Sequence, residues 1–188
     1  MVLFVILVSL LVIAGCATSA PVPGSAAATA TGTPAAVQAA AGSPLPMDRH
    51  VTLGSGNKTV DVSVESFEVG PKEETGIRIV TIYVAAHNTG TRPVMMVWYS
   101  RLTDQEGKPY GGIGISHDGD GARTNWILPN GTEAARDYVV VNSDRNLALL
   151  SKGAVLDVYF MDKPSEYANV SDVPDYHVAW TINPGTIS

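Results

Sequence analysis

Two aspartates, Asp118 and Asp120, flank a glycine in the stretch SHDGDGAR (116–123) and could supply oxygen ligands to a metal ion. Ca²⁺ takes about six to eight oxygen ligands, and carboxylates at this spacing can wrap around it. The stretch lacks the third carboxylate and the distal glutamate of a complete EF-hand loop. A polar turn between strands is therefore the main interpretation, with Ca²⁺ binding as the alternative and no other cofactor expected.

The only cysteine of the chain, Cys16, directly follows an apolar run at residues 2–15. A single cysteine cannot form an intrachain disulfide, so the core alone must hold the fold together. The run is shorter than the roughly 20 residues that a membrane-spanning helix needs, and it is typical of the apolar part of a signal peptide. Cys16 is thus a candidate for lipid attachment after export.

Residues Ile13, Ala14, Gly15 and Cys16 resemble a lipobox, the processing site of secreted lipoproteins. The resemblance implies cleavage before Cys16, acylation of Cys16, and a protein anchored to the outer face of a membrane in the cell envelope. Acyl chains would replace the removed apolar run as anchor, at about 0.8 kcal/mol per buried CH₂. The alternative is an uncleaved anchor with an incidental cysteine. Met1 is not followed by the usual Lys or Arg, which favours a true start farther upstream.

Residues 17–46 are rich in Ala, Pro, Ser, Thr and Gly and contain no charged side chain. Such a segment has too few large apolar groups to bury and is expected to be a disordered tether. The net charge of the chain is −6, which argues against nucleic acid or anionic lipid as a partner. The predicted organisation is a signal peptide at 1–15, an acylated cysteine and tether at 16–46, and one domain at 47–188.

The domain alternates apolar and polar residues with a period of two, as half-buried strands do. In TVDVSVE (59–65), valines alternate with polar residues. In GIRIVTIYVAAHN (76–88) both faces carry apolar residues, which predicts a central strand covered on both sides. Further strands are expected at 93–104, 133–143, 154–161 and 175–183, with shorter ones near 50–53, 110–116 and 123–128.

One helix is expected at 143–153, with Ser143 or Asp144 as its N-cap and Gly153 beyond its end. The many short strands separated by turns predict an all-β protein. Its expected fold is an antiparallel immunoglobulin-like β-sandwich of about seven to nine strands. A small closed barrel is the alternative, because the pattern alone separates the two folds poorly.

The strands and turns also follow a recurring pattern: a strand ending in Asn-x-Gly, a Pro-Val strand, Asp-x-x-Gly-x-x-Tyr, and Pro-x-Gly before an apolar strand. The matching residues are Asn88, Gly90, Pro93, Val94, Asp104, Gly107, Tyr110, Pro129 and Gly131. Over roughly residues 58–160 the chain resembles a large family of lipoprotein domains of unknown function with an immunoglobulin-like fold. The resemblance implies this fold and a surface-lipoprotein setting, and it carries over no catalytic residue.

No motif of the sequence indicates catalysis. No paired histidine spacing suits zinc, and neither a G-x-S-x-G elbow nor a free cysteine nucleophile is present. His87 and His177 fall in expected strands and are interpreted as hydrogen-bonded sandwich residues. Three sequons, beginning at Asn57, Asn130 and Asn169, matter only where the host glycosylates exported proteins. The protein is therefore not expected to be an enzyme.

Two groups of side chains are candidate contact points for a partner. On the 93–104 strand, Met95 and Tyr99 share one face, which could meet another protein if it is exposed. The long connection at 162–176 carries Tyr167 and Tyr176, amphipathic side chains suited to an interface. The leading hypothesis is a membrane-anchored, non-catalytic β-sandwich lipoprotein that binds another cell-envelope component, protein or glycan. The alternatives are a small-ligand or Ca²⁺-binding sandwich and an envelope hydrolase.

Overall fold

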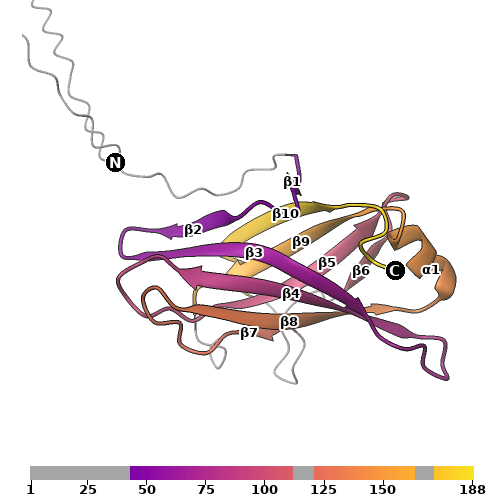
Figure 1. Cartoon of the computed structure of the whole chain (residues 1–188), viewed down its shortest axis with the longest axis horizontal. Coiled ribbons are helices and arrows are strands. Elements are labelled where there is room, and N and C mark those ends of the chain that lie inside the picture. Colours follow the sequence, from indigo (N-terminus) through magenta and orange to yellow (C-terminus); the bar gives the residue numbers. More distant parts are fainter. Residues whose placement is uncertain (1–42, 112–120, 164–171) are drawn as a thin grey trace, which may run out of the picture. The chain divides into compact units, whose positions relative to one another are not determined.

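The computed structural model describes residues 43–111, 121–163 and 172–188, which fold into two β-sheets packed face to face (Figure 1). The first sheet contains β2 (Val51–Ser55), β3 (Lys58–Val69), β4 (Arg78–Asn88) and β8 (Thr132–Val141). The second contains β1 (Leu45–Pro46), β5 (Val97–Asp104), β6 (Pro109–Gly111), β7 (Ala122–Arg123), β9 (Ala154–Met161) and β10 (Tyr176–Ile182).

The strand order mixes hairpins with connections between the sheets. The four-stranded sheet has the order β2-β3-β4-β8, and the six-stranded sheet has the order β1-β10-β9-β5-β6, with β7 paired to β5. All pairs are antiparallel except β1 with β10. The predicted all-β sandwich is therefore confirmed, and the two sheets of the described residues stay separate rather than closing into a barrel.

Several segments differ from the sequence prediction. The strand expected near 123–128 is reduced to β7, with Ile127 in an isolated bridge, and the strand expected at 110–116 lies outside the described residues beyond Gly111. The strand expected at 93–104 begins only at Val97, because Val94 instead forms an isolated bridge with Ile127. Leu45 and Pro46, expected at the end of the tether, pair with β10 as β1. The described residues thus form one strand more than the predicted maximum of nine, and the additional strand is β1.

The core lies between the sheets and is built by the alternation of the sequence. On β3, Val60, Val62 and Val64 are buried. A β-bulge just after Val64 then moves the inward positions to Phe67 and Val69, because one extra residue reverses the alternation. The largest side chains that the sandwich fully buries include Trp98, Phe160, Trp180, Ile82 and Met96.

The central strand β4 is covered on one side only, which corrects the expectation of a strand covered on both. Val80, Ile82 and Val84 are fully buried between the sheets. Ile79 and Tyr83, on the outer side, are half-buried by their neighbours, and among the described residues no helix or strand lies over them (Figure 1). The Tyr83 hydroxyl instead donates a hydrogen bond to Glu68 at 3.0 Å.

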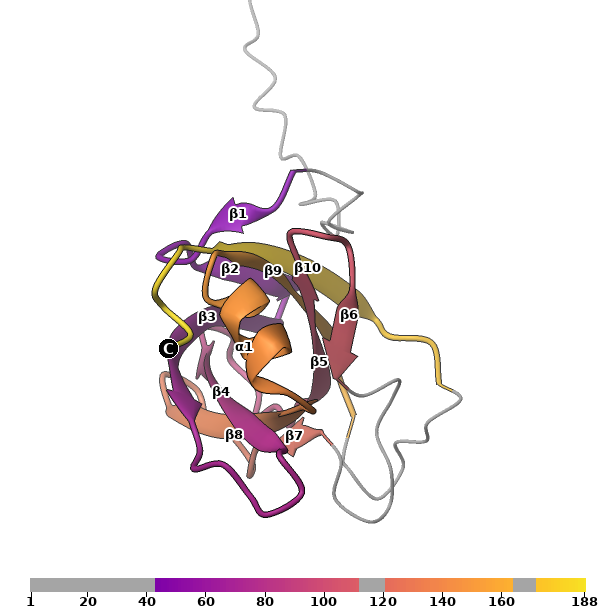
Figure 2. The ribbon, with the colours of Figure 1, turned by 90° about the vertical axis from the view of Figure 1, so that its right-hand side faces the viewer.

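The short helix α1 (Asp144–Leu150) closes one end of the sandwich, as Figure 2 shows from that end. The Ser143 hydroxyl accepts a hydrogen bond from the Asn146 N–H at 3.2 Å and so satisfies an amide at the helix start. Leu150 is buried in the core, and Gly153 follows with a φ of 114° that favours glycine. The predicted helix is confirmed, with Ser143 as its N-cap.

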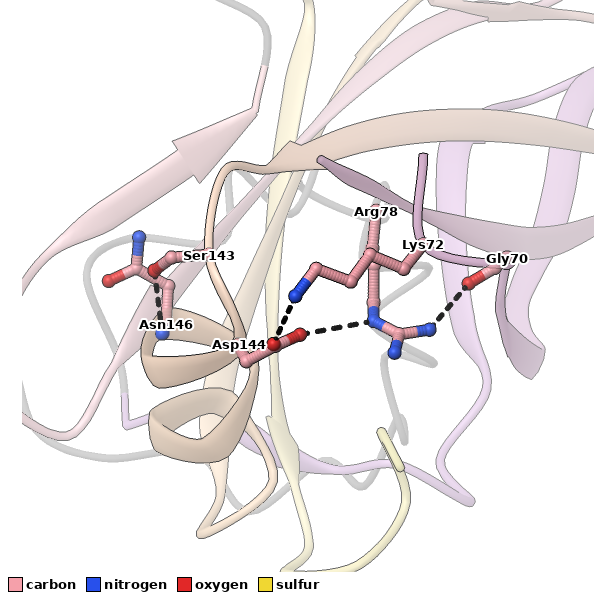
Figure 3. A network of polar contacts seen from close by, with 6 residues as sticks. All are labelled: Gly70, Lys72, Arg78, Ser143, Asp144 and Asn146. Atoms are coloured by element: carbon pink, nitrogen blue, oxygen red, sulfur yellow. Dashed lines mark hydrogen bonds and ion pairs between the residues drawn. The ribbon is translucent and has the colours of Figure 1, made fainter. Parts of the chain in front are cut away.

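Ion pairs and hydrogen bonds link the connection between β3 and β4 to the start of α1 (Figure 3). The Asp144 carboxylate lies 2.6 Å from Lys72 Nζ and 3.5 Å from Arg78 Nε. Arg78 also donates to the Gly70 carbonyl at 3.2 Å. The hydrogen bond from Lys72 lowers the pKa of Asp144, and Arg78 acts in the same direction. Because Lys72 and Asp144 are exposed, their ion pair contributes little to the stability of the fold.

Candidate functional site

A row of three aromatic rings crosses the outer face of the six-stranded sheet. Side chains of a strand alternate between its two faces, so odd-numbered residues of β5, β9 and β10 point away from the core. The strand register places Tyr99 opposite Tyr159, and Tyr159 opposite His177. The Tyr99 and Tyr159 ring centroids are 4.8 Å apart at an interplanar angle of 16°, and those of Tyr159 and His177 are 4.5 Å apart at 7°.

Charged groups lie beside this row. Asp157 is opposite Arg101 in the sheet. Its carboxylate lies 2.9 Å from His177 Nε2 and 3.4 Å from Arg101 Nη2. Arg101 also donates to the Tyr159 hydroxyl at 2.9 Å, and its guanidinium carbon lies 5.7 Å from the Tyr159 ring centroid. These five residues, which we call the tyrosine ladder (Tyr99, Arg101, Asp157, Tyr159 and His177), form one connected cluster.

Both tyrosine hydroxyls of the ladder have a raised pKa, and burial is the main cause in each case. Burial raises the pKa of Tyr159, and the neighbouring Asp157 carboxylate raises it further, while Arg101 opposes both. Burial also raises the pKa of Tyr99, against the opposing effect of Arg101. Both hydroxyls therefore remain hydrogen-bond donors at neutral pH. The ladder combines such donors with an exposed guanidinium and a nearly buried carboxylate.

The geometry suits binding better than catalysis. The His177 and Asp157 pair could orient an imidazole, as in hydrolases. However, the His177 side chain is 40% exposed, and Asp157 is its only hydrogen-bond partner among the described residues. A hydrolase requires a nucleophile within reach of such a pair. The cluster itself contains no serine, threonine or cysteine, and it offers polar and aromatic contacts to a ligand.

The residues that the sequence analysis selected are only partly brought together. Tyr99 is part of the ladder. Met95 is half-buried just before β5, in the alternation that faces outward with Tyr99. Tyr176 begins β10 but packs against the core, where burial and then the charges of Asp162 and Asp175 raise its pKa. It is therefore more a core residue than a free interface anchor.

Other selected residues lie outside the described part of the chain: Cys16, Asp118, Asp120 and Tyr167. The lipid-attachment and Ca²⁺ hypotheses accordingly stay predictions. Within residues 43–111, 121–163 and 172–188, no three acidic, histidine or cysteine side chains are grouped closely enough to hold a metal ion. In the same part of the chain, no helix has the length and apolar character needed to cross a membrane.

Sequence reasoning missed Arg101, Asp157 and Tyr159, and it assigned His177 only a structural role. One signal was present: Asp157 interrupts the otherwise apolar strand AVLDVYFM. A charged residue in the middle of a central strand needs a partner, because an unpaired buried charge is costly. The partners themselves could not be named, since they come from strands far away in the sequence.

No protein-family model matches the chain, and no curated protein matches it. An uncharacterised β-sandwich protein from Clostridium difficile shares 12% identity, with a TM-score of 0.41 over 73% of this chain and 93% of that one. A Bordetella pertussis protein proposed to be ApaA shares 13% identity, with a TM-score of 0.40 over 68% and 94% of the two chains. A proposed lipoprotein from Bacillus subtilis shares 13% identity, with a TM-score of 0.35 over 69% and 39%.

All three TM-scores are below 0.5. The low identities and TM-scores assign no ligand, partner or activity to this chain. The resemblance to the lipoprotein-domain family consequently still rests on the pattern from Asn88 to Gly131, without support from a family match.

Proposed function

We propose that this chain is a membrane-anchored, non-catalytic β-sandwich that binds another cell-envelope component, protein or glycan, through the tyrosine ladder. The anchor is the acylated Cys16, and the residues from 17 to just before β1 are the tether that holds the domain away from the membrane. The tyrosine ladder is the single observation on which the proposed binding function rests. The Ca²⁺ alternative depends on Asp118 and Asp120, which lie outside the described residues.

The chemistry of the ladder favours recognition over a purely structural role. A cross-strand pair stabilises a sheet by only about 0.2–1 kcal/mol. Stability alone therefore does not explain why two tyrosines, a histidine and an ion pair lie on an outer face. Tyrosine and arginine are enriched at interfaces because they offer large contact areas and directional hydrogen bonds. The stacked rings also hold one another in place, so little conformational freedom remains to be lost on binding.

The stacking geometry limits how a ligand can approach. The ring faces of Tyr159 are occupied by Tyr99 on one side and His177 on the other. A ligand above the sheet therefore meets ring edges, hydroxyls and the Arg101 guanidinium. Such a surface suits a partner rich in hydrogen-bond acceptors, whether the side chains of a protein or the hydroxyls of a glycan.

Site-specific photocrosslinking in native cells tests the location of the binding face. A photoreactive residue at Ala179, opposite Asp157 on β10, is expected to capture an envelope component. The matched control is Ala85 on β4, which is equally half-buried but lies on the outer face of the other sheet. Tyr159→Ala should reduce the Ala179 product at least tenfold, because it removes the centre of the ladder.

Equal capture from Ala179 and Ala85 would contradict the proposal, and so would capture from Ala179 that Tyr159→Ala leaves unchanged. A second control is Tyr138→Ala, which removes an exposed tyrosine from β8 of the other sheet and should leave capture intact. Melting temperatures of all variants show whether the loss of capture reflects unfolding. Digestion of the captured product with a protease or a glycosidase identifies the partner as protein or glycan.

The anchor is tested at Cys16. Cys16→Ser is expected to abolish incorporation of labelled fatty acid, because serine offers no sulfur for acylation, and to leave residues 1–15 attached. Intact mass of the protein from native cells measures both changes. Ser19→Ala, in the tether, should leave both acylation and cleavage unchanged. A wild-type protein that retains residues 1–15 with an unmodified cysteine would establish the incidental-cysteine alternative instead.

A further inference from the structure

We propose that Asn57 and Asn130 are acceptor sites for N-linked glycans. Each lies in a sequon with no proline at its centre, Asn57-Lys58-Thr59 and Asn130-Gly131-Thr132. A sequon alone is a short and common motif, so its structural context decides its meaning. The expected context is an exposed turn in an exported domain, and the inference therefore rests on the exported location given under the proposed function.

Both asparagines occupy exposed turns that lead into strands. Asn57 lies in the turn between β2 and β3, one residue before β3 begins. Asn130 lies in the turn before β8 and has a φ of 62°, a left-handed conformation that asparagine tolerates better than most residues. A glycan at either position would extend into solvent without displacing a packed side chain.

The backbones of these turns are fixed while the side-chain amides have no hydrogen bond among the described residues. The Asn57 carbonyl accepts from the N–H groups of Thr91 and Arg92 at 3.0 and 3.2 Å. The Asn130 N–H donates to the Asn88 carbonyl at 2.8 Å. Modification of the side chains would therefore break no hydrogen bond of the described fold, and the attachment points would be rigid.

The asparagines whose side chains form hydrogen bonds within the fold do not lie in sequons. Asn88 and Asn146 are buried, and both use their side chains in hydrogen bonds. The Asn142 side chain accepts from Asn146. None of these three is followed two positions later by the serine or threonine of an acceptor motif, as the sequence shows. Both sequons of the described residues thus fall on exposed, unbonded amides, although Asn125 and Asn183 are exposed without a sequon.

The two sites lie at one end of the domain. Asn57 contacts the connection at 89–92 through its carbonyl, and Asn130 contacts the start of the same connection at Asn88. Both turns belong to the four-stranded sheet, whereas the tyrosine ladder is on the six-stranded sheet. Glycans at Asn57 and Asn130 would shield this end while leaving the ladder face free. The third sequon, at Asn169, lies outside the described residues and is not part of the proposal.

The reaction would join the asparagine Nδ2 to the anomeric carbon of a sugar. The donor class is a lipid-linked oligosaccharide phosphate, and transfer requires a membrane glycosyltransferase of the host. A new N–C bond forms as the bond between the anomeric carbon and the phosphate oxygen breaks. The lipid phosphate leaves with the bonding electron pair, and the proton lost from Nδ2 passes to a base.

Glycopeptide mass spectrometry of the full chain, purified from its native cells, tests the proposal. Peptides that contain Asn57 and Asn130 are expected to carry a hexose-containing mass addition. Asn57→Gln and Asn130→Asp should each remove one glycan from the intact mass, and the double variant should remove both. Aspartate is chosen at position 130 because it tolerates a positive φ. The matched control is Asn125, which is exposed but not in a sequon and should stay unmodified.

Unmodified peptides at both Asn57 and Asn130 would overturn the proposal. So would a mass addition at Asn125 equal to that at the sequons, because attachment would then not depend on the acceptor motif. The failure can be separated from a failure of the proposed function. In the same cells, the acyl mass on Cys16 reports anchoring, and capture at Ala179 reports binding.

Discussion

Asn88→Ala is expected to lower the free energy of unfolding by about 3 kcal/mol, because each buried polar group that loses its partner costs about 1–3 kcal/mol. Asn88 is fully buried at the end of β4. Its Nδ2 donates to the carbonyls of Arg92 and Ile127, both at 2.8 Å, and its Oδ1 accepts from the Gly90 N–H at 2.9 Å. Alanine removes all three bonds, and urea denaturation of the purified protein measures the loss.

Two further variants give this prediction its controls. Asn125→Ala changes an exposed asparagine and should stay within about 0.5 kcal/mol of the wild type. Asn88→Asp keeps the acceptor for Gly90 but sets a carboxylate against two carbonyl oxygens. It should therefore be at least as destabilising as alanine near neutral pH and should recover partly in acid. A loss below about 1 kcal/mol for Asn88→Ala would show that other groups replace its bonds.

The Asn-x-Gly part of the family-like pattern thus has a structural cause. Gly90 lies so close to the turn between β2 and β3 that an added Cβ would be 2.5 Å from the Asn57 carbonyl oxygen. Asn88 in turn bonds the connections on both sides of it. Asn88 and Gly90 are therefore needed to pack the connection that follows β4 against the two neighbouring loops. The pattern could therefore indicate the fold from sequence while giving no information about a ligand.

The strands were predictable because burial of one face imposes a period of two on the sequence. The β-bulge in β3 was not, because residues 64–69 contain no proline or glycine that would mark an irregularity. The uncovered face of β4 was also missed. Ile79 and Tyr83 indicate a second buried face by hydrophobicity alone, but half-burial among neighbours in a single sheet is enough to accommodate them.

The candidate site depends on the register between neighbouring strands, and the sequence of one strand alone does not determine that register. Tyr99 could be selected because it shares a face with Met95. Its stacking on Tyr159 depends on how β5 pairs with β9, and the third ring depends on how β9 pairs with β10. A shift of one residue in either pair would turn these side chains to the opposite face and dismantle the row. Such pairings are fixed by the packing of the whole core.

Asp104→Asn is expected to destabilise the domain by about 2 kcal/mol at neutral pH, because hydrogen bonds to a charged group contribute about 1.5–3 kcal/mol. Asp104 is buried at the end of β5. Its Oδ1 accepts from the N–H groups of Glu106 and Lys108 at 2.9 and 3.0 Å, and its Oδ2 accepts from the Tyr110 hydroxyl at 2.7 Å. Asparagine replaces one acceptor oxygen with an NH₂ group that faces the Tyr110 hydroxyl.

The same variant should change the acid sensitivity of the protein. Burial raises the pKa of Asp104, but the hydrogen bonds from Tyr110, Lys108 and Glu106 outweigh it and hold the pKa below its usual value. The wild type therefore gains stability from this carboxylate above the unfolded-state pKa of about 4 and loses it as the pH falls through the lower folded-state value. Asparagine does not titrate, so the gap between wild type and variant should shrink below about pH 4.

Tyr110→Phe separates the hydrogen bond from the charge. It removes only the donor to Oδ2, so at neutral pH it should cost about 1 kcal/mol, less than Asp104→Asn. Because this hydrogen bond lowers the pKa of Asp104, its loss should also move the acid-induced decline of stability to higher pH. Urea denaturation at several pH values between about 3 and 7 measures both effects, a range that brackets the carboxyl titration. A wild-type advantage over Asp104→Asn that stays constant across this range would mean that Asp104 contributes through shape rather than charge.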